Sequence, residues 1–315
     1  MEDNKKITPS LFGTDLKGAK GFLRDVIAGI CIGVSFIIPG FSGGSVAAIL
    51  GIYERLVNAV AGFFKEFRKS ILTLLPIGIG LIVGIGALLF PIGYFLEKFP
   101  LPTVSLFVGF AIGGIPTMAG RVKGKISATD IMTLLSTLIA VAFLSLIPGG
   151  SEVNLMGLNF GGYLLLFLIG IVGACALLIP GISGSMLLLI LGYYRPLVSL
   201  VTDNILRFEN VGMSLLVLAV CGAGMVVGFF LISAIMKHLL EKYPRGTYFA
   251  IIGFIIGSLP TVYISTMKDA GMMSNSFDII SMPLSIFYYV ACIFLLVTGI
   301  SASLSFANFA EKKSD

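Results

Sequence analysis

The sequence predicts an all-α polytopic membrane protein made of two inverted repeats, each a Pro-Gly-broken re-entrant helical hairpin plus three transmembrane helices. The first observation behind this is composition: 57% of the 315 residues are apolar, 12% are charged, and mean hydropathy is +1.04. So few polar side chains cannot cover a water-facing surface, which excludes a soluble enzyme. The other two observations are long uncharged runs and an internal repeat.

Stretches without Asp, Glu, Lys or Arg recur along the chain, and each is long enough for a hydrocarbon core that needs about 20 apolar residues. They cover residues 26–53, 71–96, 131–151, 153–194, 210–236, 246–267 and 279–310. Six spans are expected, at 71–96, 102–120 and 131–148 in the first half and at 213–236, 247–267 and 283–307 in the second.

Two blocks of the sequence match one another: Ile38-Pro39-Gly40-Phe41-Ser42-Gly43-Gly44-Ser45 and Ile179-Pro180-Gly181-Ile182-Ser183-Gly184-Ser185-Met186. We call them the first and second Pro-Gly blocks. Each is followed at the same spacing by Leu-Gly-x-Tyr, and further on by Leu-Glu-Lys-aromatic-Pro at residues 96–100 and 240–244. A Gly-Phe pair at 109–110 recurs at 253–254 in the same order. Duplicated halves of this kind are typical of transporters.

The repeat also predicts topology. Whether a Pro-Gly segment is a re-entrant hairpin or two short crossings, it returns to its starting side, so each half crosses an odd number of times and the second half is inverted. One side then holds all but four of the 21 Lys and Arg residues, the four being Lys98, Arg195, Arg207 and Lys268. The positive-inside rule therefore places both termini in the cytoplasm.

The chain is expected to divide into four parts. Residues 1–25 form a cytoplasmic N-terminal segment, either a short helix on the inner leaflet or a disordered basic tail. Residues 26–150 are the first repeat, 151–310 the second inverted repeat, and 311–315 a cytoplasmic tail.

Proline and glycine within an apolar run break a helix and leave backbone groups that only protein or a water-filled cavity can cover. A helix restarting after the break points N–H groups and its positive dipole end at membrane depth, which favours an anion, and glycines let a phosphate approach closely. The predicted phosphate-binding residues are Pro39, Gly40, Ser42, Gly43, Gly44, Ser45, Arg55, Pro180, Gly181, Ser183, Gly184, Ser185 and Arg195. The alternative is that the blocks are hairpin tips whose small residues serve helix packing. Their duplication in inverted halves favours a binding site.

Charged residues follow both blocks. A helix from Gly44 to Arg55 rises about 17 Å, close to half of a ~30 Å core. Arg55 is therefore expected at the inner face and Arg195 at the outer one, either as phosphate ligands or as interfacial anchors. No Asp or Glu lies inside an uncharged run, so Glu54, at the edge of one, is the candidate for coupling to protons.

Signatures of catalysis are missing from the sequence. It has no H-E-x-x-H and no G-x-x-x-x-G-K-[ST], one histidine (His238), and four scattered cysteines inside apolar runs. We expect no enzyme activity, no cofactor and no metal site. The G-x-x-x-G pairs Gly109/Gly113 and Gly253/Gly257 predict helix packing.

The paired blocks with their trailing Leu-Gly-x-Tyr resemble the polyprenyl-phosphate transporter family over about residues 25–310. The resemblance implies a multi-pass protein of the bacterial cytoplasmic membrane that returns undecaprenyl phosphate from the outer to the inner leaflet for cell-envelope synthesis. Its partners would be a polyprenyl-phosphate lipid and the bilayer, not nucleic acid; the oligomeric state stays open.

The alternative function is secondary transport of a small soluble anion. Such a transporter needs a polar aqueous path, and this chain carries almost no charge inside its spans. The second block has Ser185 where the first has Gly44, and Pro196 where the first has Arg55. The two half-sites are therefore expected to bind differently.

Overall fold

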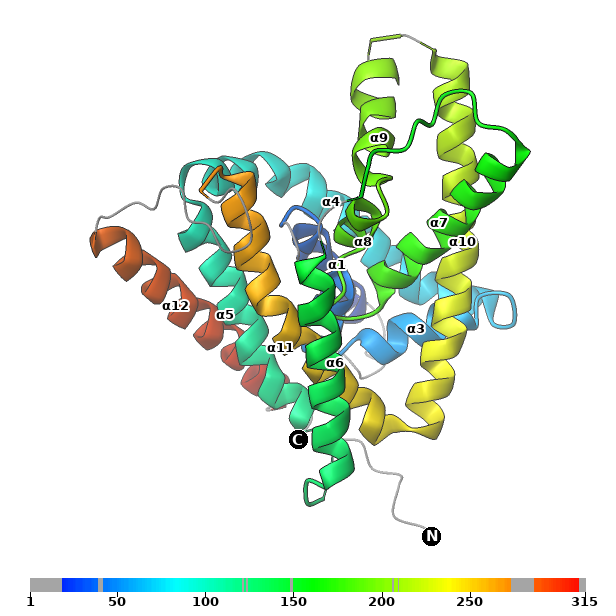
Figure 1. The fold of residues 1–315 in the computed structure, drawn as a ribbon. Helices are drawn as coiled ribbons and strands as arrows, with labels where there is room; N and C mark the ends of the chain where they lie inside the picture. The colour runs from blue at the N-terminus through cyan, green and yellow to red at the C-terminus, as the bar shows by residue number, and fades with distance from the viewer. Residues whose placement is uncertain are drawn as a thin grey trace.

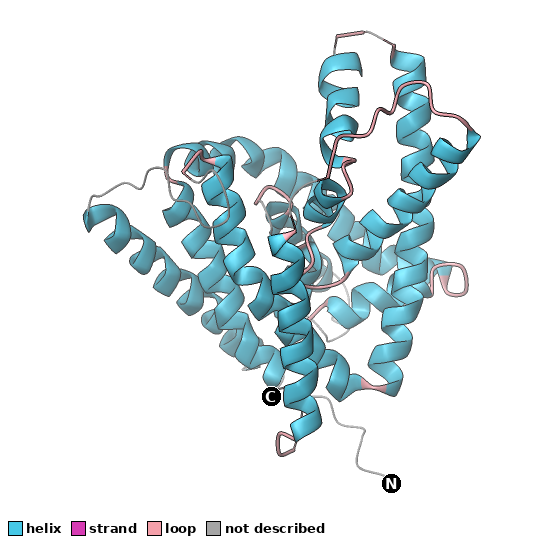
Figure 2. Cartoon of the chain, in the orientation of Figure 1, coloured by secondary structure: helices cyan, strands magenta, loops and turns pink. Residues whose placement is uncertain are grey.

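A computed structural model describes residues 19–38, 42–120, 122, 124–147, 150–205, 207–208, 210–272 and 286–311. These residues form helices joined by loops and turns, with no strand among them (Figures 1 and 2). The helices of the first half are α1 Ala19–Ser35, α2 Gly43–Ile49, α3 Tyr53–Ala61, α4 Phe67–Lys98, α5 Pro100–Ala119 and α6 Ala128–Leu146. Those of the second half are α7 Phe160–Leu178, α8 Gly184–Ile190, α9 Tyr194–Ser199 with the π-helix η2 Leu200–Ile205, α10 Val211–Lys242, α11 Pro244–Asp269 and α12 Ile286–Glu311.

Five of these helices, α4, α5, α10, α11 and α12, are long and apolar enough to cross a membrane. An all-helical fold with several candidate membrane spans is therefore confirmed. The sixth expected span, at 131–148, falls on α6, whose apolar stretch is shorter and which is not among these five. Within the expected N-terminal segment the structure describes residues 19–25. They form the first part of α1, which continues without a break to Ser35. The inversion of the halves, the re-entrant hairpins and the division of the chain remain predictions.

The two Leu-Glu-Lys-aromatic-Pro sequences end one long helix and begin the next. α4 ends at Lys98 and α5 begins at Pro100, while α10 ends at Lys242 and α11 begins at Pro244. The residue before each proline leaves the helical region, with φ −135° and ψ 60° at Phe99, because the proline ring disfavours α geometry there. The repeated sequence thus has the same structural role in both halves.

Glycines let the helices of each half approach closely. α1 packs on α4, where a Cβ added at Gly80 would lie 2.0 Å from the Val26 carbonyl oxygen. α7 packs on α10 in the same way, since a Cβ at Gly224 would lie 2.0 Å from the Phe167 carbonyl oxygen. Each pair therefore depends on backbone-to-backbone contact.

The remaining long helices pair across the halves. α5 packs against α12 and α11 against α6, as Figure 1 shows. Gly109 and Gly113 of α5 face α12, and Gly253 and Gly257 of α11 face α6, which confirms the packing role of both G-x-x-x-G pairs. Arg245 at the start of α11 also pairs with the buried Asp130 of α6, its Nε 2.9 Å from a carboxylate oxygen.

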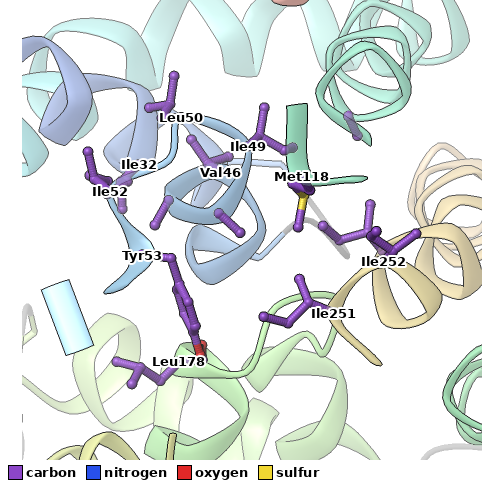
Figure 3. Packing of buried hydrophobic residues seen from close by; sticks show 14 of the residues in the cluster. Ile32, Val46, Ile49, Leu50, Ile52, Tyr53, Met118, Leu178, Ile251 and Ile252 are labelled. Carbon is purple, nitrogen blue, oxygen red and sulfur yellow. The ribbon is translucent and has the colours of Figure 1, made fainter. Parts of the chain in front are cut away.

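The largest buried cluster surrounds the first Pro-Gly block. All seven residues of α2 are buried, and Figure 3 shows Val46 and Ile49 of α2 among side chains that include Met118 of α5 and Ile251 of α11. By contrast, only Gly184 is buried in α8 and no residue in α9. α2 is thus enclosed by protein, whereas α8 and α9 are much less so.

Candidate functional site at the contact of the two Pro-Gly blocks

The two Pro-Gly blocks touch one another. The Gly181 N–H donates a hydrogen bond to Ser45 Oγ at 2.7 Å, and the Ser42 hydroxyl donates to the Ile179 carbonyl oxygen at 3.4 Å. A Cβ added at Gly44 would lie only 2.6 Å from the Leu178 carbonyl oxygen, so the backbones meet there. Residues far apart in the sequence therefore form one cluster.

The local conformation of each block explains this contact. Gly181 has φ +85°, a left-handed conformation that glycine adopts without strain, and a Cβ there would collide with Phe254. Ser183 caps α8 by accepting a hydrogen bond from the Met186 N–H at 3.4 Å, and its Oγ lies 3.0 Å from that of Ser185. Ser42 occupies the same place before α2 but makes no such cap, because its hydroxyl reaches across to the other block.

α3 ties the first block to both α7 and α11. The buried Tyr53 hydroxyl donates to the Leu178 carbonyl oxygen at 3.1 Å, and Figure 3 shows its ring pointing toward Leu178. That oxygen is one of the last carbonyls of α7, where helix geometry offers no internal partner. The Tyr248 hydroxyl of α11 donates to a Glu54 carboxylate oxygen at 2.5 Å. Glu54 is therefore hydrogen-bonded to α11.

A buried ion cluster holds Arg55. Its two terminal nitrogens lie 3.1 and 2.6 Å from the two carboxylate oxygens of Asp25, a two-point contact that fits the planar guanidinium. Arg24 also contacts that carboxylate, with its Nε 2.9 Å from one oxygen. The Arg24 and Asp25 side chains are only 7% exposed. The cluster therefore lies within the protein, where an unpaired charge costs several kcal/mol.

Sequence reasoning missed Asp25. A readable signal was present, since the uncharged run 26–53 begins after Asp25 and ends before Glu54 and Arg55. If that run folds back on itself, the charges at its two ends must meet. A hairpin was expected at this place, so the ion pair followed from the topology already predicted.

Arg195 has a different environment from Arg55. It lies 3.4 Å from Glu152, and the two side chains are 73% and 60% exposed. Arg195, Glu152 and Tyr194 line a cavity of about 270 Å³. Arg55 lines a separate cavity of about 340 Å³ together with Lys69 of α4 and Lys237 of α10.

The predicted site residues thus fall into three groups. Ser42, Gly44 and Ser45 meet Pro180 and Gly181 at the contact of the blocks. A second group lies outside this contact. Gly43 packs against Phe36 and Ile32, and Ser183 to Ser185 lie at the start of α8. Arg55 is paired with Asp25, and Arg195 with Glu152. Pro39 and Gly40 lie outside the described residues.

Metal ligands do not gather in the part of the chain that the structure describes, since no three His, Cys, Asp or Glu side chains there come together. Cys31, Cys221 and Cys292 are free thiols. The polar groups at the contact of the blocks include the carbonyl oxygens of Leu178 and Ile179, the hydroxyls of Ser42 and Ser45 and the Gly181 N–H. The hydroxyls and the N–H are donors of the kind that bind an oxyanion.

Comparison with known proteins gives three findings. A family model described as VCA0040-like, undecaprenyl phosphate translocase-like, matches residues 32–279. The polyprenyl-phosphate transporter of Staphylococcus aureus is 31% identical over 244 residues, which cover 76% of this chain and 85% of that protein. The polyprenyl-phosphate transporter of Vibrio cholerae is 26% identical over 258 residues, which cover 77% and 78%. No solved structure matches the chain.

Proposed function

Because the chain belongs to the undecaprenyl phosphate translocase-like family, we propose that it moves undecaprenyl phosphate from the outer to the inner leaflet of the bacterial cytoplasmic membrane. The lipid carrier would thereby return for reuse in cell-envelope synthesis, without any covalent chemistry. The observation that carries this proposal is the direct contact between the two Pro-Gly blocks. A phosphate reaching one block lies next to the other.

Helix lengths support hairpins that enter the membrane without crossing it. α1 has 17 residues and rises about 25 Å, less than a ~30 Å hydrocarbon core. α2 and α3, with seven and nine residues, are shorter still. With both termini on the cytoplasmic side, the first hairpin enters from the inner face and the second from the outer face. Their contact then lies near the bilayer midplane, the usual depth of a transporter's substrate site.

Arg195 is the outer group best suited to capture the phosphate. Its pair with Glu152 is exposed, and exposed pairs contribute only about 0–1 kcal/mol, so a phosphate with two negative charges can replace that carboxylate. The phosphate would pass from Arg195 to the hydroxyls and N–H groups of the two blocks, and then toward Arg55. Most of the prenyl chain stays in lipid during this movement, which agrees with the absence of charges in the expected spans.

Purified protein in liposomes tests the function. Labelled undecaprenyl phosphate is placed in one leaflet, its accessibility in the other is followed, and uptake of free phosphate ion is measured in parallel. We expect the lipid to change leaflet without phosphate uptake. Phosphate uptake without lipid movement would instead establish the small-anion alternative.

Replacing Arg195 is expected to slow capture from the outer side. Arg195→Ala loses a charge-assisted contact of roughly 1.5–3 kcal/mol, which corresponds to about 10- to 100-fold in the rate at low lipid concentration. Arg195→Lys keeps the charge but not the planar fork, so it should recover part of the rate. Arg207→Ala, at another outer arginine, is the control and should transport normally. Unchanged leaflet distribution in both Arg195 variants would remove Arg195 from the path.

Glu54 is our candidate for coupling transport to protons. Ionised, it is a strong acceptor for the Tyr248 hydroxyl; protonated, it is a weaker one, so protonation would loosen α3 from α11. In Glu54→Gln we expect transport to lose its response to an imposed pH gradient while slow downhill movement remains. Glu97→Gln, at an exposed carboxylate paired with Lys98, should keep the response. A wild-type response in Glu54→Gln would exclude this role.

A further inference from the structure

An apolar groove of about 390 Å³ lies between α10 and α11, beside the second Pro-Gly block. Ile179 and Pro180 of the block line it at one side, Ile235 and Met236 line it on α10, and Gly246 and Ala250 line it on α11. Thr247 also belongs to the lining, but its hydroxyl donates to the Tyr243 and Leu239 carbonyl oxygens at 2.8 and 3.1 Å. Tyr243 supplies the other hydroxyl of the lining, and the remaining side chains are apolar, so the groove offers a mainly apolar surface.

The groove exists because α11 has small residues where it faces α10. A Cβ added at Gly246 would meet nothing within 4 Å, so this glycine leaves open space. Gly253 and Gly257 of the same helix are different, because a Cβ on either would collide with the backbone of α6. Helix packing thus accounts for those two glycines and leaves Gly246 unexplained.

We propose that this groove binds the isoprene units nearest the phosphate of the transported lipid; the inference rests on the proposed function. Ile179 connects the groove to the contact of the two blocks. It lines the groove, and its carbonyl oxygen accepts a hydrogen bond from the Ser42 hydroxyl. A phosphate at the contact of the blocks therefore has an apolar surface for its attached chain at Ile179 and Pro180. The groove falls within the 300–1,000 Å³ typical of small-molecule sites and is far smaller than a whole undecaprenyl chain, so the distal units remain in the bilayer.

The same geometry favours a single prenyl chain over a phospholipid. A diacyl lipid brings two chains and a glycerol with ester groups, whereas the groove is one mainly apolar space of about 390 Å³ in which the Thr247 hydroxyl is already bonded to backbone carbonyls. The groove would then help to distinguish a prenyl monophosphate from the phospholipids that surround the protein.

Gly246→Leu tests the groove because it fills the space with little disturbance of the fold. Leucine forms helices better than glycine, and the added side chain meets no backbone at this position. Gly222→Leu is the matched control, since a Cβ there also meets nothing within 4 Å but Gly222 does not line the groove. The full chain is reconstituted in phosphatidylethanolamine and phosphatidylglycerol vesicles. The probe is a polyprenyl phosphate with a diazirine in its first isoprene unit.

We expect wild-type protein and Gly222→Leu to crosslink to peptides of α10 and α11 that line the groove. Gly246→Leu should lose crosslinking and slow leaflet exchange, each by about tenfold or more, because the apolar contact is replaced by a side chain. Wild-type exchange and crosslinking in Gly246→Leu would overturn the groove assignment and leave the proposed function intact. Equal labelling of the groove by a diazirine-bearing phosphatidic acid would also overturn it. Absence of lipid exchange by the wild type would overturn the proposed function itself.

Discussion

Replacing Asp25 with alanine is expected to lower the free energy of unfolding by about 3–5 kcal/mol, the cost of removing one partner from a buried ion pair. Asp25 is 5% exposed and contacts both Arg24 and Arg55. Without its carboxylate, two guanidinium groups with like charge remain close together in a region of low dielectric. Because Arg55 then loses its two-point contact with this carboxylate, we also expect transport to fall.

Thermal unfolding in detergent measures this effect. A thiol-reactive dye is a suitable reporter, because Cys31, Cys221 and Cys292 are free and at least partly buried, so unfolding exposes them. Glu152→Ala, which removes the carboxylate from the exposed Arg195 pair, is the matched control and should change stability by less than about 1 kcal/mol. Equal melting midpoints for the two variants would show that the Asp25 cluster does not stabilise the fold.

Gly44→Ala is expected to reduce transport by about 5- to 140-fold, since a displacement of packed backbone costs roughly 1–3 kcal/mol. The new methyl group would lie 2.6 Å from the Leu178 carbonyl oxygen and 3.2 Å from the Pro180 nitrogen. These are backbone atoms, so the two blocks must separate. The hydrogen bonds from Gly181 to Ser45 and from Tyr53 to Leu178 would lengthen with them.

Gly43→Ala is the control for Gly44→Ala. It makes the same change in the same helix, but its nearest neighbours are side-chain atoms, Phe36 Cζ at 3.1 Å and Ile32 Cγ2 at 3.2 Å, which can adjust. Ser45→Ala adds a second test, because it removes the hydrogen bond from Gly181 without adding bulk. If Gly44→Ala and Ser45→Ala both transport like Gly43→Ala, the contact of the blocks is a packing device only.

Features with a local cause were predictable from the sequence. A proline sets the conformation of the residue before it, so the helix ends at Lys98 and Lys242 could be located from two short motifs. The close-packing glycines at 109, 113, 253 and 257 were identified by their spacing, but that spacing does not say which helix they face. The pairing of α5 with α12 and of α11 with α6 depends on the whole fold.

The candidate site was predictable in its residue types and less so in its contacts. Ser42 and Ser183 occupy matching places in the two blocks, but only Ser183 caps its own helix, because Ser42 bonds to Ile179. Arg55 and Arg195 both follow their blocks, but only Arg55 has a buried carboxylate within reach. Such differences arise from neighbours brought together by folding, so a comparison of the two repeats alone cannot supply them.

The crossed pairing of long helices has a consequence for how the protein is made. α5 is synthesised well before its partner α12, which is the last helix in the part of the chain that the structure describes; α6 likewise precedes its partner α11. The small residues that α5 presents to α12 stay uncovered in the bilayer until α12 has been made, so the first half cannot complete its helix contacts by itself. Two halves produced as separate polypeptides should therefore be degraded when alone and accumulate when produced together, because each half supplies the helices that pack against those of the other.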